Sequence, residues 1–185
     1  MPKIVCSKED WIELGYNLFA IKGIDGLVVE QMADKLKCNK SSFYWHFKNK
    51  TNFLDEIISY WIQQETQGVI DYVEARSGPK EKYNAFLEIC FQHDPYLEFI
   101  FYLKRYAVKS KKHQRIIDEI DQRRLDYTAS LYIGLGFSKS KAKVMASVFY
   151  KYLIGYHEMN RYRKPSKNHP KIVKKELSHL IKFQQ

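Results

Sequence analysis

The sequence predicts an all-α fold. Apolar residues recur at helical spacing in one segment after another of the 185-residue chain. Glycine, proline and asparagine separate these segments, and no convincing run of alternating apolar residues indicates a strand. With 45% hydrophobic and 15% aromatic residues, the chain can bury a core as one large domain or two small ones. We expect about nine helices from the periodicity.

The first helix is expected to begin after Ser7. Asp10 follows three residues later, which makes a variant of the capping box. The helix should end near Gly23, because glycine readily adopts the left-handed conformation that terminates helices. Its apolar stripe consists of Trp11, Leu14, Gly15, Leu18 and Phe19.

Residues 28–47 predict two short helices joined by a tight turn. The turn covers residues 37–39, and Asn39 can cap the second helix by accepting a backbone N–H near Ser42. In that helix Phe43 and Phe47 can both point inward. Such a pair forms a helix-turn-helix unit, whose second helix enters the major groove of DNA. The apolar face of the first helix is Val29, Met32, Ala33 and Leu36.

A fourth helix is predicted to begin at Lys50, capped by Asn49, and to continue to roughly Val73. Gly68 weakens its last turns, and Gly78-Pro79 ends it. Its apolar face is Phe53, Leu54, Ile57, Ile58 and Trp61. Five further helical segments are expected, at residues 80–91, 96–108, 113–135, 138–161 and 170–183.

Charge and cysteine content narrow the class of protein. A formal net charge of +10 favours an anionic partner, such as a nucleic acid or an acidic membrane surface. Cys6, Cys38 and Cys90 are odd in number and widely spaced, which favours reduced thiols over a disulfide framework or a zinc site. No signal peptide or membrane-spanning stretch is visible, so we expect a soluble, cytoplasmic protein.

Motifs for catalysis or metal binding are not evident. The sequence has no Ser/His/Asp constellation, no glycine loop that would cradle a phosphate, and no HExxH. His93 beside Asp94, and His157 beside Glu158, are neighbours in the sequence, and such side chains point apart on a helix. We therefore expect neither an enzyme nor a metal or cofactor site.

Residues 8–58 resemble the N-terminal domain of the TetR family of bacterial repressors. The resemblance is carried by Leu18-Phe19, Gly23, Leu27, Met32-Ala33, Leu36, Phe43-Tyr44-Trp45-His46-Phe47-Lys48-Asn49-Lys50 and Phe53-Leu54. Tyr44-Trp45-His46 with Lys48-Asn49-Lys50 is particularly similar to the tetracycline repressors. The remaining two thirds resembles the family only in the length and order of its helices. The resemblance implies a DNA-binding domain over residues 1–50, with its helix-turn-helix at about 28–47, and a regulatory domain for ligand binding and dimerisation over 51–185.

The second helix of the motif is basic. From Lys35 to Leu54 there are five lysines and no acidic residue, and lysines of this kind contact phosphates. By resemblance, Lys50 contacts a phosphate, and Val29 stands where the family often has a hydroxyl that touches the backbone. Trp45 could instead pack against the fourth helix. The predicted DNA-binding residues are Val29, Lys40, Ser41, Ser42, Tyr44, Trp45, His46, Lys48 and Lys50.

Two residues depart from the family pattern. Lys37 occupies a turn position where the family commonly has glycine, so this lysine has to tolerate a positive φ angle. Glu30 replaces a basic residue that contacts bases in the most similar relatives; its carboxylate would repel phosphate and could accept from cytosine N4. The operator sequence of those relatives therefore does not carry over.

The C-terminal part is rich in aromatic residues, which could line a cavity for a small apolar or aromatic effector or could simply fill the core. The tetracycline-binding residues of the relatives do not align here, so tetracycline is not the predicted ligand. The candidate ligand-binding residues are Phe86, Cys90, Phe99, Tyr102, Tyr106, Tyr127 and Tyr152.

The last two predicted helices correspond by position to the dimer interface of the family. The candidate interface residues are Val144, Val148, Gly155, Val173, Leu177, Leu180 and Ile181. The sequence as a whole predicts a homodimeric TetR-type regulator, by family habit a repressor, that binds a palindromic operator in double-stranded DNA and is released by a small molecule. The alternative is a DNA-bound adaptor whose C-terminal bundle binds a protein partner.

Overall fold

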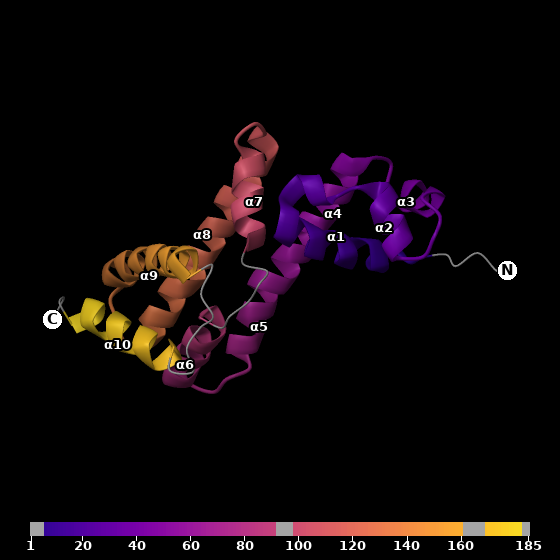
Figure 1. Cartoon of the computed structure of the whole chain (residues 1–185). Helices are drawn as coiled ribbons and strands as arrows, with labels where there is room; N and C mark the ends of the chain where they lie inside the picture. Colours follow the sequence, from indigo (N-terminus) through magenta and orange to yellow (C-terminus); the bar gives the residue numbers. More distant parts are fainter. Residues whose placement is uncertain (1–5, 92–97, 161–168, 183–185) are drawn as a thin grey trace. The chain divides into compact units, whose positions relative to one another are not determined.

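The computed structural model describes residues 6–91, 98–160 and 169–182, and all regular structure in these ranges is helical (Figure 1). The α-helices are α1 (Lys8–Lys22), α2 (Val29–Lys35), α3 (Ser41–His46), α4 (Lys50–Ile62), α5 (Gly68–Glu74), α6 (Pro79–Cys90), α7 (Glu98–Ala107), α8 (Lys111–Gly134), α9 (Lys139–Asn160) and α10 (His169–Lys182). A π-helical turn, Gln63–Gln67, joins α4 to α5. The chain is therefore helical without a break from Lys50 to Glu74, where the sequence predicts one long helix. The all-α prediction is confirmed.

The described residues form two compact units. Unit 1 comprises residues 6–65 and 98–117, and unit 2 comprises residues 66–91, 118–160 and 169–182. These units do not divide at residue 50, the boundary expected between the DNA-binding and regulatory parts, because α4 and α7 both pack on α1 in unit 1. The functional division at residue 50 stays a prediction.

The core of unit 1 is aromatic. Trp11, Phe43 and Phe53 are fully buried, with the Phe43 ring 5.3 Å from that of Trp11 and 5.0 Å from that of Phe53. A Cβ atom on Gly15 would lie 2.5 Å from the Phe53 ring, so this glycine permits the close approach of α1 and α4. Leu36 of the expected apolar face of α2 is half-buried, as are Leu14 and Leu18 of the apolar stripe of α1.

Helix α7 completes this core, which the sequence did not predict. The Phe99 ring lies 4.6 Å from that of Phe19 and 5.1 Å from that of Trp61, and the Tyr102 hydroxyl donates to the Ile21 carbonyl (2.9 Å). Tyr106 packs edge-on against His113, 5.2 Å away. Phe99, Tyr102 and Tyr106 were predicted to line a ligand site in the C-terminal bundle. All three residues pack within unit 1, and their contact with a ligand stays a prediction.

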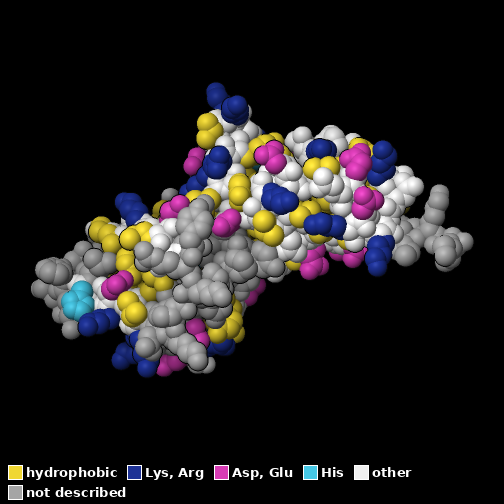
Figure 2. Space-filling view, in the orientation of Figure 1, with side chains coloured by type: hydrophobic (Ala, Val, Ile, Leu, Met, Phe, Trp, Pro, Cys, Tyr) yellow, Lys and Arg dark blue, Asp and Glu magenta, His cyan; other side chains and the backbone are white. Residues whose placement is uncertain are grey.

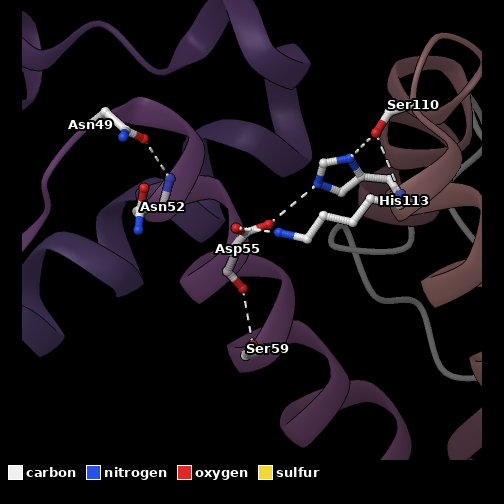
Figure 3. Close-up of polar contacts among 7 residues, drawn as sticks. Asn49, Asn52, Asp55, Ser59, Ser110 and His113 are labelled. Atoms are coloured by element: carbon white, nitrogen blue, oxygen red, sulfur yellow. Dashed lines mark hydrogen bonds and ion pairs between the residues drawn. The ribbon is translucent and has the colours of Figure 1, made fainter.

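A polar contact joins α4 to the start of α8 within unit 1 (Figure 3). The buried Nε2 of His113 lies 3.4 Å from the buried Oδ1 of Asp55, and Lys112 Nζ lies 2.6 Å from Asp55 Oδ2. On the other side of the ring, His113 Nδ1 lies 2.7 Å from the Ser110 hydroxyl. The Asp55 carboxylate thus faces two basic groups from one helix end.

Unit 2 has a separate core built from α5, α6, α8, α9 and α10. Its buried side chains include Val73, Phe86, Phe91, Tyr132, Phe149, Val173 and Leu177. Val173 and Leu177 were predicted to form the dimer interface; this is wrong, because both are buried in the core of their own unit. The side chains of Leu180 and Ile181 lie outside the described residues. Across the described ranges, no helix combines the length and apolarity needed to span a bilayer.

Candidate nucleic-acid interface

The turn between α2 and α3 is built by local backbone hydrogen bonds. Lys37 has φ 55°, the positive value expected of it, and Cys38 N–H donates to the Ala33 carbonyl (3.0 Å). The Asn39 side chain accepts from Ser41 N–H (2.9 Å), one residue earlier than expected, while its carbonyl accepts from Ser42 N–H (2.9 Å). These contacts define where α3 begins.

The inner face of α3 packs against the rest of unit 1. Phe43 and Phe47 are buried, as predicted. The Ser42 hydroxyl accepts from Trp11 Nε1 (3.3 Å) and donates to the Cys6 carbonyl (3.4 Å), and His46 Nε2 lies 2.8 Å from the same carbonyl. Ser42 and His46 are half-buried, and these contacts direct them toward the segment before α1.

The side chain of Val29 is only 2% exposed, because it packs in the core of unit 1. The expected contact of this side chain with the DNA backbone is therefore wrong. Ser42 and His46 differ from Val29 in keeping some exposure, and their predicted contact with DNA would compete with the hydrogen bonds to Trp11 and Cys6.

The remaining predicted DNA contacts are all exposed. Trp45 is 80% exposed and Tyr44 is 56% exposed, so the alternative in which Trp45 packs against the fourth helix is wrong. Asn49 caps α4 by accepting from Asn52 N–H (2.9 Å), as predicted, and this places Lys50 at the first position of α4. We call the exposed set the recognition face; it consists of Lys40, Ser41, Tyr44, Trp45, Lys48 and Lys50.

The recognition face carries three lysines and two aromatic rings. Positive charge and donors on an exposed short helix suit a phosphate backbone, and the residues near its N-terminus can reach base edges. Glu30 of α2 partly neutralises the positive charge of the recognition face. Its carboxylate lies 3.7 Å from Lys40 Nζ, and both side chains are exposed. Figure 2 accordingly shows acidic side chains beside basic ones at the α2–α3 end of unit 1.

These features define a helix-turn-helix domain of the kind that binds DNA. Residues 12–57 match the family model of bacterial regulatory proteins of the tetR family. The "Probable acrEF/envCD operon repressor" of Escherichia coli K12 is 31% identical over 58 residues, which are 31% of this chain and 25% of that protein. The matched part thus spans about a quarter of the length of this relative. The N-terminal domain of the chain is therefore similar to that of bacterial regulatory proteins of the tetR family.

Solved structures extend the likeness in fold to almost the whole chain. A transcriptional regulator from Saccharomonospora viridis, solved in complex with choline, has a TM-score of 0.77 at 12% identity and covers 95% of each chain. A transcriptional regulator from Aquifex aeolicus has a TM-score of 0.62 at 22% identity, covering 96% of this chain and 99% of that one. At these identities the likeness shows a common fold.

Four candidate ligand-binding residues lie in unit 2. Phe86 is buried, with its ring 5.1 Å from that of Phe149 and 6.0 Å from that of Tyr127. Tyr127 donates to Glu74 (2.9 Å) and Tyr152 donates to Glu176; burial, with the neighbouring carboxylate, raises the pKa of both phenols. Cys90 is half-buried, and its carbonyl lies 2.8 Å from His157 Nε2.

Two polar pairs in unit 2 were not predicted. The hydroxyls of Tyr83 and Tyr132 lie 3.3 Å apart, and Tyr150 donates to Asp121 (2.6 Å). Burial raises the pKa of Tyr150 to about 12, so it donates as a neutral phenol. The sequence showed that the C-terminal part is rich in aromatic residues, but it could not show which side chains would meet. Among the described residues, no group of three or more His, Cys, Asp or Glu is placed to hold a metal ion.

The outer side of α9 presents apolar residues in unit 2. Val144 is 52% exposed and Val148 is 39% exposed, and nothing lies within 4 Å of a Cβ atom built on Gly155. Met159 on α9 and Ile172 on α10 are also exposed, and the sequence did not single them out. We call Val144, Val148, Gly155 and Met159 the α9 stripe, because their spacing places them on one side of that helix.

Proposed function

We propose that the protein is a homodimeric transcriptional repressor that binds a palindromic operator and is released by a small molecule. The recognition face is the main observation that supports the proposal. Basic and aromatic side chains are exposed on one side of α3, and the other side of this helix is buried in the core of unit 1. The name of the relative from Escherichia coli supports repression over activation. Two copies of α3 would read half-sites about one helical turn apart.

Phosphate contacts are expected to supply most of the affinity. Lys40, Lys48 and Lys50 each neutralise a phosphate in this proposal, so binding should weaken steeply as salt is raised. Tyr44 and Ser41 offer hydrogen-bond groups to bases or phosphates. Glu30, paired with Lys40, would disfavour operators that require a phosphate near the start of α2.

Release would require an effector that binds one state of the dimer more tightly than the other. The aromatic residues of unit 2, including Phe86, Tyr127 and Tyr152, support an apolar or aromatic effector. The fold neighbour from Saccharomonospora viridis was solved with choline, and aromatic faces also attract quaternary ammonium groups. Choline is therefore a suitable first probe, followed by flat aromatic compounds.

The DNA-binding proposal can be tested with duplexes selected from a randomised library. We expect enrichment of a palindrome, and fluorescence anisotropy should show weaker binding as salt rises. Lys50→Ala and Tyr44→Phe should together weaken binding about tenfold or more, since each lost contact costs roughly 1 kcal/mol.

Lys80→Ala serves as the matched control, because it removes the same charge from an exposed position in unit 2. It should change affinity little, and circular dichroism should show all variants folded. Salt-independent binding, or equal affinity for selected and random duplexes, would contradict the proposal.

A second candidate is the DNA-bound adaptor. In that case a protein partner, rather than a second copy of this chain, covers the α9 stripe. The two candidates differ in oligomeric state: the repressor requires a dimer without any further protein, whereas the adaptor needs its partner to cover the stripe.

A further inference from the structure

The turn between α7 and α8, which belongs to unit 1, is strongly basic. Residues 99–117 contain six lysine or arginine residues and no aspartate or glutamate, and all six basic residues are exposed. Figure 2 shows dark blue side chains at the tip where α7 meets α8. We call this set the basic turn; it consists of Lys104, Arg105, Lys109, Lys111, Lys112 and Arg115.

Local hydrogen bonds fix the backbone of the basic turn. The Gln114 side chain donates to the carbonyls of Ala107 (2.8 Å) and Val108 (3.1 Å), and Ser110 N–H also donates to the Ala107 carbonyl (2.9 Å). The Ser110 hydroxyl lies 2.7 Å from Nδ1 of the buried His113. Lysines often bind the last carbonyl groups of a helix, but at the end of α7 a glutamine binds them. The basic side chains therefore extend from a turn of defined shape.

Three side chains of the basic turn have no acidic partner in the part of the chain that the structure describes. Lys112 Nζ lies 2.6 Å from Asp55 Oδ2. By contrast, no described carboxylate lies within ion-pair distance of Lys109, Lys111 or Arg115. Like charges held close together repel one another, and an anion from outside the protein would relieve that repulsion.

Helix α4 joins the basic turn to the recognition face within unit 1. Lys50, which belongs to the recognition face, is the first residue of α4, and Asp55 follows five positions later. These two positions are about 7.5 Å apart along the helix axis. Lys112 and His113 both contact Asp55, as Figure 3 shows for His113. A duplex carries a phosphate charge about every 1.7 Å of its axis, so DNA bound at Lys50 offers further phosphates over a separation of this size.

We propose that the basic turn binds the phosphate backbone of DNA and is a second contact surface beside the recognition face. The proposal rests on the proposed function, since it requires that the protein binds double-stranded DNA. Ammonium and guanidinium groups neutralise phosphates without reading the sequence, so the turn adds affinity and not specificity. An acidic membrane surface fits less well. Val108 is the one exposed apolar residue in residues 104–115, and binding to a membrane surface needs apolar area in addition to charge.

The test compares wild type with the double variant Lys109→Gln, Lys111→Gln in the full-length protein. Fluorescence anisotropy with the selected duplex is repeated over a series of salt concentrations. We expect about tenfold weaker binding at low salt, and a slope of log affinity against log salt that is smaller by about one for each lost phosphate contact. The ratio of the affinities for selected and random duplexes should stay the same, because phosphates carry no sequence information.

Ethylation of single phosphates in the selected duplex locates the contact. Some ethylated positions should weaken the binding of wild type and have no effect on the double variant, and these positions mark the phosphates that the basic turn contacts. Positions contacted by Lys50 should weaken the binding of both proteins.

Two further double variants are the matched controls. Lys109→Arg, Lys111→Arg keeps the positive charge and should retain the affinity and the salt dependence of wild type. Lys80→Gln, Lys139→Gln removes the same charge from exposed positions in unit 2 and should also leave both unchanged. Circular dichroism should show that all variants are folded.

Equal affinity and equal salt dependence of wild type and the Lys109→Gln, Lys111→Gln variant would overturn the proposal. In that case DNA binding that is weakened by Lys50→Ala would leave the proposed function intact. Flotation with vesicles that contain phosphatidylserine tests the membrane. Vesicle binding that the double variant loses, with DNA binding unchanged, would also overturn the proposal. If wild type binds no duplex at all, the proposed function fails and this proposal fails with it.

Discussion

At the scale of single residues, Lys37 holds a backbone conformation that suits glycine. Its φ of 55° costs an L-residue roughly 1–2 kcal/mol. Lys37→Gly should therefore raise the free energy of unfolding by about 0.5–1 kcal/mol, after the extra backbone freedom of glycine in the unfolded chain is deducted. Urea denaturation followed by circular dichroism measures the change.

Lys35→Gly is the matched control, since it makes the same substitution at the last residue of α2. It should lower the free energy of unfolding, because glycine weakens a helix. If Lys37→Gly is as destabilising as Lys35→Gly, the positive φ carries no strain.

Several residues could be placed from the sequence alone, and others could not. Periodicity was sufficient for Phe43, Phe47 and the buried face of α4, because a helix exposes one side and buries the other. It could not place Ser42 and His46, whose orientation depends on a carbonyl of Cys6 in a distant segment. Spacing along the chain says little about such contacts between distant segments.

At the scale of helices, the capping box of α1 predicts how the stability of the protein depends on pH. Asp10 accepts from the backbone N–H (2.8 Å) and hydroxyl (2.7 Å) of Ser7, and the Ser7 side-chain bond, followed by the backbone bond, lowers the pKa of Asp10. Ser7→Ala should cost about 1 kcal/mol at neutral pH through loss of the cap. Ser59→Ala is the control, since Ser59 is exposed within α4 and its hydroxyl only bonds back to Asp55 of the same helix.

The cost of Ser7→Ala should depend on pH. A lowered pKa in the folded state means that the Asp10 carboxylate stabilises the protein above its unfolded-state pKa, and that this contribution disappears as pH falls through the folded-state pKa. The difference between wild type and Ser7→Ala should therefore shrink toward strongly acidic pH. A cost that stays constant across that range would show that Asp10 takes no part in the cap.

The bounds of most helices were predictable, but the partners of α7 were not. Gly78, Pro79 and Asn49 interrupt or cap helices locally, and the structure begins or ends helices at those residues. Helix α7 has an ordinary amphipathic pattern, which does not reveal that Phe99 packs on Phe19 and Trp61. Val144 and Val148 of α9 were predicted to lie in an interface, and both are exposed. Val173 and Leu177 of α10 were predicted from the same kind of periodic pattern, but both are buried within unit 2.

At the scale of the whole molecule, the α9 stripe predicts self-association. Val148→Lys places a charge in the middle of an apolar contact between two copies and should convert the dimer to a monomer, which light scattering after gel filtration measures directly. Val108→Lys is the matched control, because Val108 is 72% exposed in unit 1.

The monomeric variant should also bind a palindromic duplex more weakly than wild type, because the two half-sites would no longer be joined in one particle. A wild-type protein that is monomeric at micromolar concentration would contradict the dimer and favour a different partner for the stripe.

The contact between α4 and α8 should be observable by proton NMR spectroscopy. The His113 side chain is 4% exposed, with Ser110 Oγ 2.7 Å from one ring nitrogen and Asp55 Oδ1 3.4 Å from the other. An imidazole N–H held there is shielded from exchange with water, so its proton resonance should be resolved downfield of the backbone amides. One signal would then report, during a titration with DNA or effector, whether Asp55 and His113 stay together, and the variant Asp55→Asn would identify the signal.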